Sequence, residues 1–379
     1  MSQITDQIHN SKISDILENS LQGTRPEYDD YIRLLDSDNV SLMGLVAGML
    51  THNKFGQKAS FVNNIILNYT NVCITDCKFC AFYRPPDHEE SYTLTLDEIE
   101  SRVKTACDLF KIRQVLIQGG HNPDLRIEYY EDSFRMIRKK FPQVGVHGLS
   151  TSEIDTIAKV EKSSTKEILS RLKDAGLQSL PGAGAEILTD NVKEIISPKK
   201  IMSDEWLRIM EEAHTLGIPA SATMMYGHLE QDEDIIEHLE HIRSLQDETG
   251  GFTAFIPWSF KKSNTALDKR VKHEQGANRY LRIMALSRIF LDNIQHIQAS
   301  WFSEGKKTGQ VALHFGGDDF GGTLFDENVM QEAGFYNRTT YDEIIGLIRE
   351  AGFVPVQRDT LYEVVRRFDE TEMEPVIST

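Results

Sequence analysis

The stretch Asn71-Val-Cys73-Ile-Thr-Asp-Cys77-Lys-Phe-Cys80-Ala-Phe-Tyr83 is the most informative part of the chain, because it holds three cysteines in the spacing C-x3-C-x2-C. Three thiolates on one tight loop are typical metal ligands. A structural zinc site needs a closed set of four ligands, and a cubane iron–sulfur cluster usually takes four cysteines. The trio therefore predicts a cluster that leaves one iron open to a substrate or a cofactor.

The fourth cysteine, Cys107, is predicted to lie apart from the trio. Around it, Ile99, Val103 and Phe110 recur at helical spacing on one apolar face. Cys107 is therefore predicted to be a small buried apolar residue of that face. Two alternatives for the trio stay open, a zinc site completed by a histidine such as His88 and three cysteines with no shared ligand. Zinc sites usually pair their cysteines in C-x2-C units. The C-x3-C-x2-C spacing of this chain therefore favours the cluster.

The composition indicates the cellular compartment of the protein and argues against some classes of partner. Four cysteines in 379 residues do not make a disulfide scaffold, and reduced thiols predict a cytoplasmic protein. A net charge of -17 repels polyanions, which argues against nucleic acid as the main partner. The first residues lack a signal-peptide pattern, and no apolar run approaches the roughly 18 residues that span a bilayer, so no membrane insertion is expected.

Short β-rich runs alternate with amphipathic helical stretches along most of the chain. Eight such runs are predicted as strands: 65–71, 114–120, 144–150, 179–188, 219–227, 251–259, 294–301 and 310–317. Helical patterns lie between them, for example at 96–110, 128–141, 203–216, 232–246 and 278–293. Eight β/α alternations predict an α/β fold of the (β/α)8 TIM-barrel type.

The barrel is expected at residues 61–322, between an N-terminal helical extension at 1–60 and a C-terminal extension at 323–379 that packs on the barrel. In a parallel barrel the active site forms at the C-terminal ends of the strands. The cysteine loop falls at such an end, as do the Gly-rich turns at 119–120, 182–184 and 316–322. Glycine lets backbone approach a ligand closely, and the convergence of these turns with the cysteines predicts one site.

These features resemble the radical S-adenosylmethionine (SAM) superfamily, whose signature is a C-x3-C-x2-C loop after the first strand of a barrel. Phe79 stands where the superfamily often has an aromatic residue, before the last cysteine. The resemblance implies a 4Fe-4S cluster on Cys73, Cys77 and Cys80 with SAM bound at the open iron. It further implies SAM contacts from five residues: Phe79, Gly119, Gly120, Ser150 and Glu186.

Closer similarity is to the futalosine branch of that superfamily, which acts in menaquinone biosynthesis. It is carried by the runs 68–73, 77–84, 118–125, 184–188, 247–258 and 319–323. This branch implies cyclisation of a small-molecule substrate, dehypoxanthine futalosine, after a 5'-deoxyadenosyl radical takes the ribose C4' hydrogen. It also implies an electron donor such as flavodoxin or ferredoxin. The alternatives are an aminofutalosine or deazaflavin synthase subunit and, in a different class, a zinc-dependent barrel hydrolase.

Ring closure in that reaction leaves a radical that must lose one electron and one proton, so some side chain accepts a proton. Five residues at predicted strand ends are candidates for this catalytic role: His147, Tyr226, His228, His314 and Asp319. A carbon radical also needs protection from water, which suits an apolar lining. Five residues are predicted to supply that lining: Met224, Met225, Phe255, Trp258 and Phe320.

Overall fold

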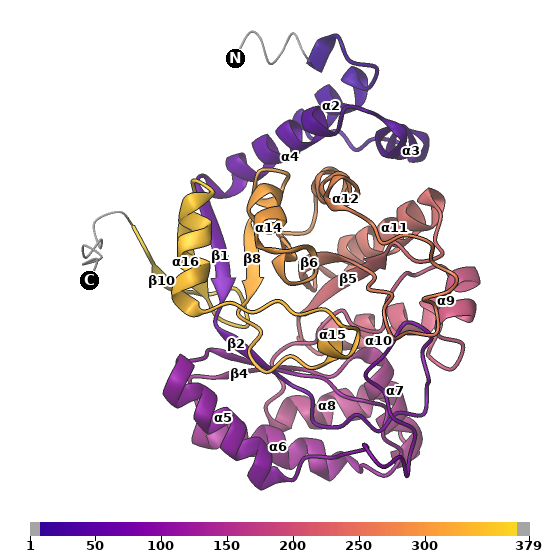
Figure 1. The fold of residues 1–379 in the computed structure, drawn as a ribbon, viewed down its shortest axis with the longest axis vertical. Helices are drawn as coiled ribbons and strands as arrows, with labels where there is room; N and C mark the ends of the chain where they lie inside the picture. The colour runs from indigo at the N-terminus through magenta and orange to yellow at the C-terminus, as the bar shows by residue number, and fades with distance from the viewer. Residues whose placement is uncertain (1–7, 370–379) are drawn as a thin grey trace.

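The computed structural model describes residues 8–369, and its centre is a ring of parallel strands (Figure 1). The strands are β1 (Lys58–Val62), β2 (Asn64–Leu67), β3 (Gln114–Ile117), β4 (Gly145–Gly148), β5 (Ala220–Tyr226), β6 (Phe252–Ser259), β7 (His296–Ile297) and β8 (Asp319–Gly322). They pair in the orders β2-β3-β4, β5-β6-β7 and β1-β8, and every pair is parallel.

Short bridges close this ring. Ser179 pairs with His147 of β4 and Leu180 pairs with Ala220 of β5, so one extended segment fills the position between those strands. Gln298 pairs with Asp319 and joins the β7 side to β8. Since β1 and β2 form one run broken only at residue 63, the ring has eight strand positions, and the predicted (β/α)8 barrel is confirmed.

Amphipathic helices surround the ring. They are α5 (Leu96–Phe110), α6 (Ile127–Lys140), α7 (Thr151–Glu161), α8 (Thr165–Ala175), α9 (Asp190–Ile196), α10 (Ser203–Thr215), α11 (Asp232–Thr249), α12 (Ala277–Phe290), α13 (Trp301–Glu304) and α14 (Lys306–Leu313). Helix α5 shows the pattern: it buries Ile99 and Val103, and Thr95 caps it in a capping box with Glu98. Within residues 8–369, no helix combines the length and apolarity that crossing a bilayer requires.

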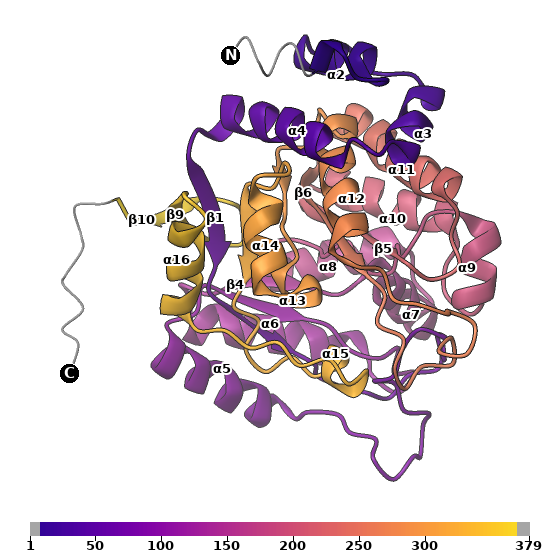
Figure 2. The ribbon, with the colours of Figure 1, turned by 45° about the horizontal axis from the view of Figure 1, so that its top comes forward.

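The N-terminal helices α2 (Ser14–Leu21), α3 (Tyr28–Asp36) and α4 (Val40–Phe55) form a layer over one end of the barrel (Figures 1 and 2). The Thr51 hydroxyl donates to the carbonyl of Gly316 at 2.9 Å, and a Cβ at Gly48 would stand 2.7 Å from the carbonyl oxygen of His314. Because α4 leads into the start of β1, this layer covers the end opposite the functional loops.

The C-terminal segment also joins the barrel. After α15 (Val329–Glu332) and α16 (Tyr341–Glu350), strand β9 (Val354–Arg358) pairs in parallel with β1, and β10 (Val364–Arg367) pairs with β9 (Figure 2). The extension therefore does more than pack on the barrel, because it supplies a strand beside β1. The division at residues 60 and 322 stays a prediction.

Two strand predictions were wrong in position. Residues 310–317 form the end of α14 and a turn, and β8 begins only at Asp319. The apolar run there is short, and its buried Gln310, Ala312 and Leu313 follow helical rather than alternating spacing. The predicted strand 179–188 shrinks to the two bridges, because Gly184 and Glu186 both adopt positive φ angles that a strand does not allow.

Candidate active site

Two connected cavities open at the C-terminal ends of the strands. The cysteine pocket, of about 170 Å³, is lined by the three cysteines together with Phe79 and Lys200. The barrel cavity, of about 290 Å³, occupies the ring itself. Four residues line both: Gln118, Ala183, Gly184 and Glu186. A group bound beside the cysteines therefore faces the interior of the barrel directly.

The cysteine loop is fixed by its own backbone. Cys73 N donates to the carbonyl of Arg84, and Lys78 N donates to the carbonyl of Ile196, both at 2.8 Å. All three thiols are free, with Cys73 and Cys77 only 7% and 6% exposed. Burial raises the pKa of Cys77 to about 12, so a bound cation is needed to stabilise its thiolate.

No trio of histidine, cysteine or acidic side chains in residues 8–369 converges on a point where a single metal ion fits. The thiolates of a cubane bind different irons and do not need to converge in that way. His88, the histidine considered for a zinc site, instead accepts a hydrogen bond from Glu90 N. His88 also does not line the cysteine pocket, which argues against the zinc site that it would complete.

Gly119 and Gly120 line the cysteine pocket, as predicted for cofactor-binding residues. A Cβ at Gly120 would stand 2.1 Å from the carbonyl oxygen of Val72 and 3.0 Å from Cys73 Cβ. A Cβ at Gly119 would stand 2.7 Å from the ring of Tyr69. Gly120 is thus required because the cysteine loop lies directly against it, and Gly119 because the Tyr69 ring does. The sequence did not reveal these reasons.

Glu186 is the buried carboxylate at the junction of the two cavities. Lys200 Nζ lies 2.8 Å from Oε1, whereas Oε2 has no hydrogen-bond partner and is 3.7 Å from Lys193 Nζ. Burial alone would raise the pKa of Glu186, but the charges of Lys200 and Lys193 outweigh it and lower that pKa. A φ of 46° at Glu186 is strained, which is common where a side chain must point into a site.

Two charged residues of the cysteine pocket were missed. Lys200 also lies 5.6 Å from the ring centre of Phe79. Glu153, in α7, accepts from Gly119 N at 3.1 Å and from the Tyr69 hydroxyl at 2.8 Å. Its signal in the sequence was the Ser150-x-x-Glu153 capping box. Ser150 lines the pocket as predicted, but its hydroxyl is already engaged with Glu153.

Of the five catalytic candidates, only His147 lines the barrel cavity, and none lines the cysteine pocket. Its Nδ1 lies 2.6 Å from the Ser179 hydroxyl, and burial, with a smaller contribution from the charge of Arg358, lowers its pKa to about 3. His147 is therefore neutral near pH 7. Asp319 lies just behind the barrel cavity, where it is fully buried and paired with Arg358.

The structure places the other three candidates outside both cavities. Tyr226 is fully buried outside both cavities. His228 holds its own turn, with Nε2 3.0 Å from the Met225 carbonyl oxygen and Nδ1 accepting from Leu229 N. His314 follows α14 at the opposite end of the barrel, 2.9 Å from the Ala351 carbonyl oxygen, because the predicted eighth strand there is a helix.

Of the five residues predicted to supply the apolar lining, only Trp258 lines the barrel cavity. Met224, Met225, Phe255 and Phe320 are buried but do not line it. The observed lining is mixed. Polar side chains line the cavity at Asn64, Gln114, Gln118, Ser221, Thr223, Thr253 and Gln298, beside apolar side chains that include Val62, Ile66, Leu116, Ile256 and Trp301. The interior therefore suits a ligand that has both polar and apolar parts.

Comparison with known proteins fits this site. The Radical SAM superfamily model matches residues 67–242, and the CofH/MqnC C-terminal region model matches residues 249–371. The structure resembles that of HydG, a maturase of the [FeFe]-hydrogenase, with a TM-score of 0.73 at 17% identity over 94% of this chain and 78% of that one. That likeness shows the fold.

The chain belongs to the radical SAM superfamily, whose members are enzymes that use a 4Fe-4S cluster and SAM. Within it, the chain belongs to the family of the cyclic dehypoxanthine futalosine synthases. It is 41% identical to that synthase of Streptomyces coelicolor over 95% of this chain and 91% of the relative. It is also 42% identical to 5-amino-6-(D-ribitylamino)uracil–L-tyrosine 4-hydroxyphenyl transferase of Methanopyrus kandleri, over 82% of this chain and 85% of that relative.

Proposed function

We propose that the protein cyclises dehypoxanthine futalosine in the futalosine route to menaquinone. The observation that carries this proposal is the direct connection between the cysteine pocket and the barrel cavity, whose lining combines polar and apolar side chains, with Glu186 at their junction. Similarity to the synthases extends over nearly the whole chain, including the C-terminal region that lines the cavity. A substrate with a hydroxyl-rich ribose and an aromatic ring matches this mixed interior.

Cys73, Cys77 and Cys80 would hold the cluster, because they are the three free thiols that line one pocket. Phe79 and Glu186, which line the same pocket, would contact SAM, the latter by accepting from ribose hydroxyls with its unpartnered Oε2. When bound, the cluster and SAM supply the 5'-deoxyadenosyl radical that removes the ribose C4' hydrogen. Lys200 keeps Glu186 ionised and in place.

The direct test is product formation. Anaerobically reconstituted protein with SAM and a reductant should convert dehypoxanthine futalosine into the spiro-cyclised product, which mass spectrometry and NMR identify, together with 5'-deoxyadenosine. Conversion of the substrates of an aminofutalosine synthase or of the 4-hydroxyphenyl transferase instead would assign the protein to that related activity. Failure to cleave SAM with any of them would refute the radical reaction and leave the zinc hydrolase.

His147 is the proton acceptor that the geometry favours. After the ribose radical adds to the benzoate ring, the product radical must lose one proton as well as one electron to regain aromaticity, and the oxidised 4Fe-4S cluster would accept that electron. The neutral imidazole faces the barrel cavity and can take that proton. We expect His147→Asn to lower spiro product formation roughly 100-fold, the usual scale for a lost acid–base group, while SAM cleavage continues.

The measurement for His147 is the ratio of 5'-deoxyadenosine formed to product formed, which should rise in the variant. His314→Asn is the matched control, because His314 is exposed at the far end of the barrel. It should keep the wild-type ratio. An unchanged ratio in His147→Asn would remove this residue from the reaction.

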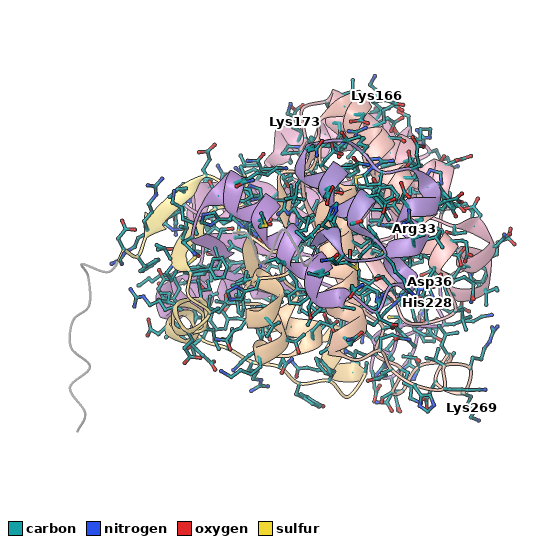
Figure 3. The ribbon with its side chains drawn as sticks, turned by 90° about the horizontal axis from the view of Figure 1, so that it is seen from above. Arg33, Asp36, Lys166, Lys173, His228 and Lys269 are labelled. Atoms are coloured by element: carbon teal, nitrogen blue, oxygen red, sulfur yellow. The ribbon has the colours of Figure 1, made fainter. Side chains whose placement is uncertain are left out.

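We further propose that a small acidic electron-transfer protein, such as a flavodoxin or a ferredoxin, supplies the electron in the cytoplasm. The 261–276 loop touches the cysteine loop, where Leu267 N donates to the carbonyl of Lys78 at 3.1 Å. Four basic side chains on these two loops are exposed: Lys78, Lys269, Arg270 and Lys272. In a chain of net charge -17 they form a local cationic surface beside the cysteines, and Figure 3 shows Lys269 at the outer edge of the molecule.

Charge reversal at Lys269, Arg270 and Lys272 together should lower flavodoxin-driven turnover roughly tenfold at low ionic strength, because complementary charge mainly raises association rates. Turnover driven by dithionite should stay unchanged. Reversal of Lys139, Lys162 and Lys166 is the control, since these exposed lysines lie on or beside α6, α7 and α8, and Lys166 projects from another edge in Figure 3. Equal losses in both triple variants would contradict this docking surface.

A further inference from the structure

The deep end of the barrel cavity is built by the C-terminal segment. Arg358 of β9 stands beside Val62 of β1, and on the inward face Val62 precedes Asn64 and Ile66. The cysteine loop follows β2, so Arg358 lies at the end of the cavity away from the cysteines. Thr360, next along the chain, fits only because β4 has Gly145 there: a Cβ would stand 2.1 Å from the Thr360 hydroxyl.

Arg358 is the only permanently charged cation among the residues that line the barrel cavity in the described chain. The residue is 4% exposed, Nε donates to Asp319, and Nη1 donates to the Asp359 carbonyl at 3.0 Å. The guanidinium carbon lies 3.8 Å from the ring centre of Tyr362. Neither of these hydrogen bonds uses Nη2, and the Thr360 hydroxyl is buried without a partner.

The positive charge of Arg358 at one end of the cavity is matched by a negative charge at the other end. Glu186, the only carboxylate among its lining residues in the described chain, stands at the opposite end, at the junction with the cysteine pocket. Trp258, Trp301 and Phe302 also line the cavity and contribute aromatic surface. An occupant with an anionic aromatic end and a hydroxyl-rich end would place each part against its complement.

We propose that Arg358 and Thr360 bind the carboxylate of the substrate's benzoate group at the floor of the barrel, which directs the ribose toward Glu186. This inference rests on the proposed function. It places the ribose C4' next to the cysteine pocket, where its hydrogen is removed, with the benzoate ring held below it. Asp319 is then a positioning residue, because it fixes the guanidinium through Nε.

Asp319 also determines how Arg358 attracts a carboxylate. Because it compensates the charge of Arg358, a carboxylate is bound by the N–H and O–H groups that point at it rather than by net charge. Such contacts are short-ranged and depend on the acceptor. The floor should therefore distinguish a carboxylate from its neutral methyl ester, and it should distinguish Arg358 from residues that cannot donate in the same way.

The test uses Arg358→Gln together with Asp319→Asn, so that no buried charge is left unpaired. With reconstituted enzyme and saturating SAM, the KM for dehypoxanthine futalosine should rise roughly 10- to 100-fold, the effect of losing a charge-assisted hydrogen bond, with a smaller change in kcat. Wild type should discriminate against the methyl ester of the substrate, relative to the free acid, by a similar factor. The double variant should accept the ester and the free acid equally well.

Arg288→Gln with Asp318→Asn is the matched control. That pair is equally buried, with 2.5 Å between Arg288 Nη2 and Asp318 Oδ1, but it lines neither cavity. Calorimetric binding of 3-acetylbenzoate to the unreconstituted proteins gives a readout independent of turnover. Wild type that forms no spiro product would refute the proposed function. Product formation with an unchanged KM and unchanged ester preference in the Arg358 variant would refute this inference alone.

Discussion

Cys77→Ala is expected to abolish both the iron–sulfur absorbance of the reconstituted protein and its cleavage of SAM. Cys77 is 6% exposed in the cysteine pocket, and the two remaining thiols cannot hold a cubane on their own. The effect on activity should be complete rather than partial, since no other cysteine lines that pocket in the described chain. Iron content, the visible spectrum and 5'-deoxyadenosine formation measure it.

Cys107→Ala is the control, because Cys107 lies on α5 and lines neither cavity. It is partly buried against the core, and Gln143 Nε2 lies 3.8 Å from its sulfur. Its replacement should cost only packing, about 1 kcal/mol of unfolding free energy, with the cluster retained. Loss of iron from the Cys107 variant, or retention of SAM cleavage by the Cys77 variant, would overturn the assignment of the ligands.

The cysteine pocket was predictable because its ligands are close in sequence. The C-x3-C-x2-C spacing places the thiols on one loop whatever surrounds them, and Gly119 and Gly120 follow the neighbouring strand. Lys200 and Glu153 were not predictable in the same way. Each reaches the pocket from a segment distant in sequence, and a lysine or a capping glutamate is ordinarily a surface residue.

The barrel was predictable from its alternating pattern, but its closure was not. Val62 and Arg358 pair although almost 300 residues separate them, and no local pattern marks such a contact. The five-residue strand β9 has only the ordinary composition of a short strand. The floor of the barrel cavity could therefore be recognised only in the structure.

The roles of the histidines near predicted strand ends also could not be predicted from the sequence alone. A histidine near a predicted strand end can face the barrel, cap a turn or stand on a helix, and the choice depends on one residue of register. His147 faces inward from β4, whereas His228 completes a turn. His314 was misplaced together with its strand. Such errors leave the predicted fold class unchanged, because it depends on the number of β/α alternations. They do change the predicted role of a single residue, because that role depends on the register of its strand.

The second large effect expected is a loss of stability in mild acid. Burial lowers the pKa of His121, His147 and His238 to about 3 and that of His214 to about 4. In the unfolded chain these side chains take up protons near pH 6.5, but the native protein does not. As the pH falls below 6.5, the unfolded state therefore gains protons and the free energy of unfolding falls.

The magnitude follows from the same linkage. Between pH 7 and pH 5, each buried histidine should lower the free energy of unfolding by about 2 kcal/mol. Glu327 acts in the opposite direction: burial raises its pKa to about 7, so the native protein gains a proton that the unfolded chain takes up only near pH 4.5. One such group offsets about 2 kcal/mol, and a net loss of several kcal/mol remains.

Urea unfolding at a series of pH values measures this loss, and His238→Asn tests its origin. The His238 ring is fully buried, and its Nδ1 accepts from Leu188 N at 3.0 Å, a bond that the asparagine oxygen can keep. The variant should lose stability less steeply below pH 6.5, by about 1.4 kcal/mol per pH unit. His9→Asn, at an exposed position, should keep the wild-type slope. If His238→Asn followed the wild-type curve, the buried neutral histidines would not be the cause of the acid lability.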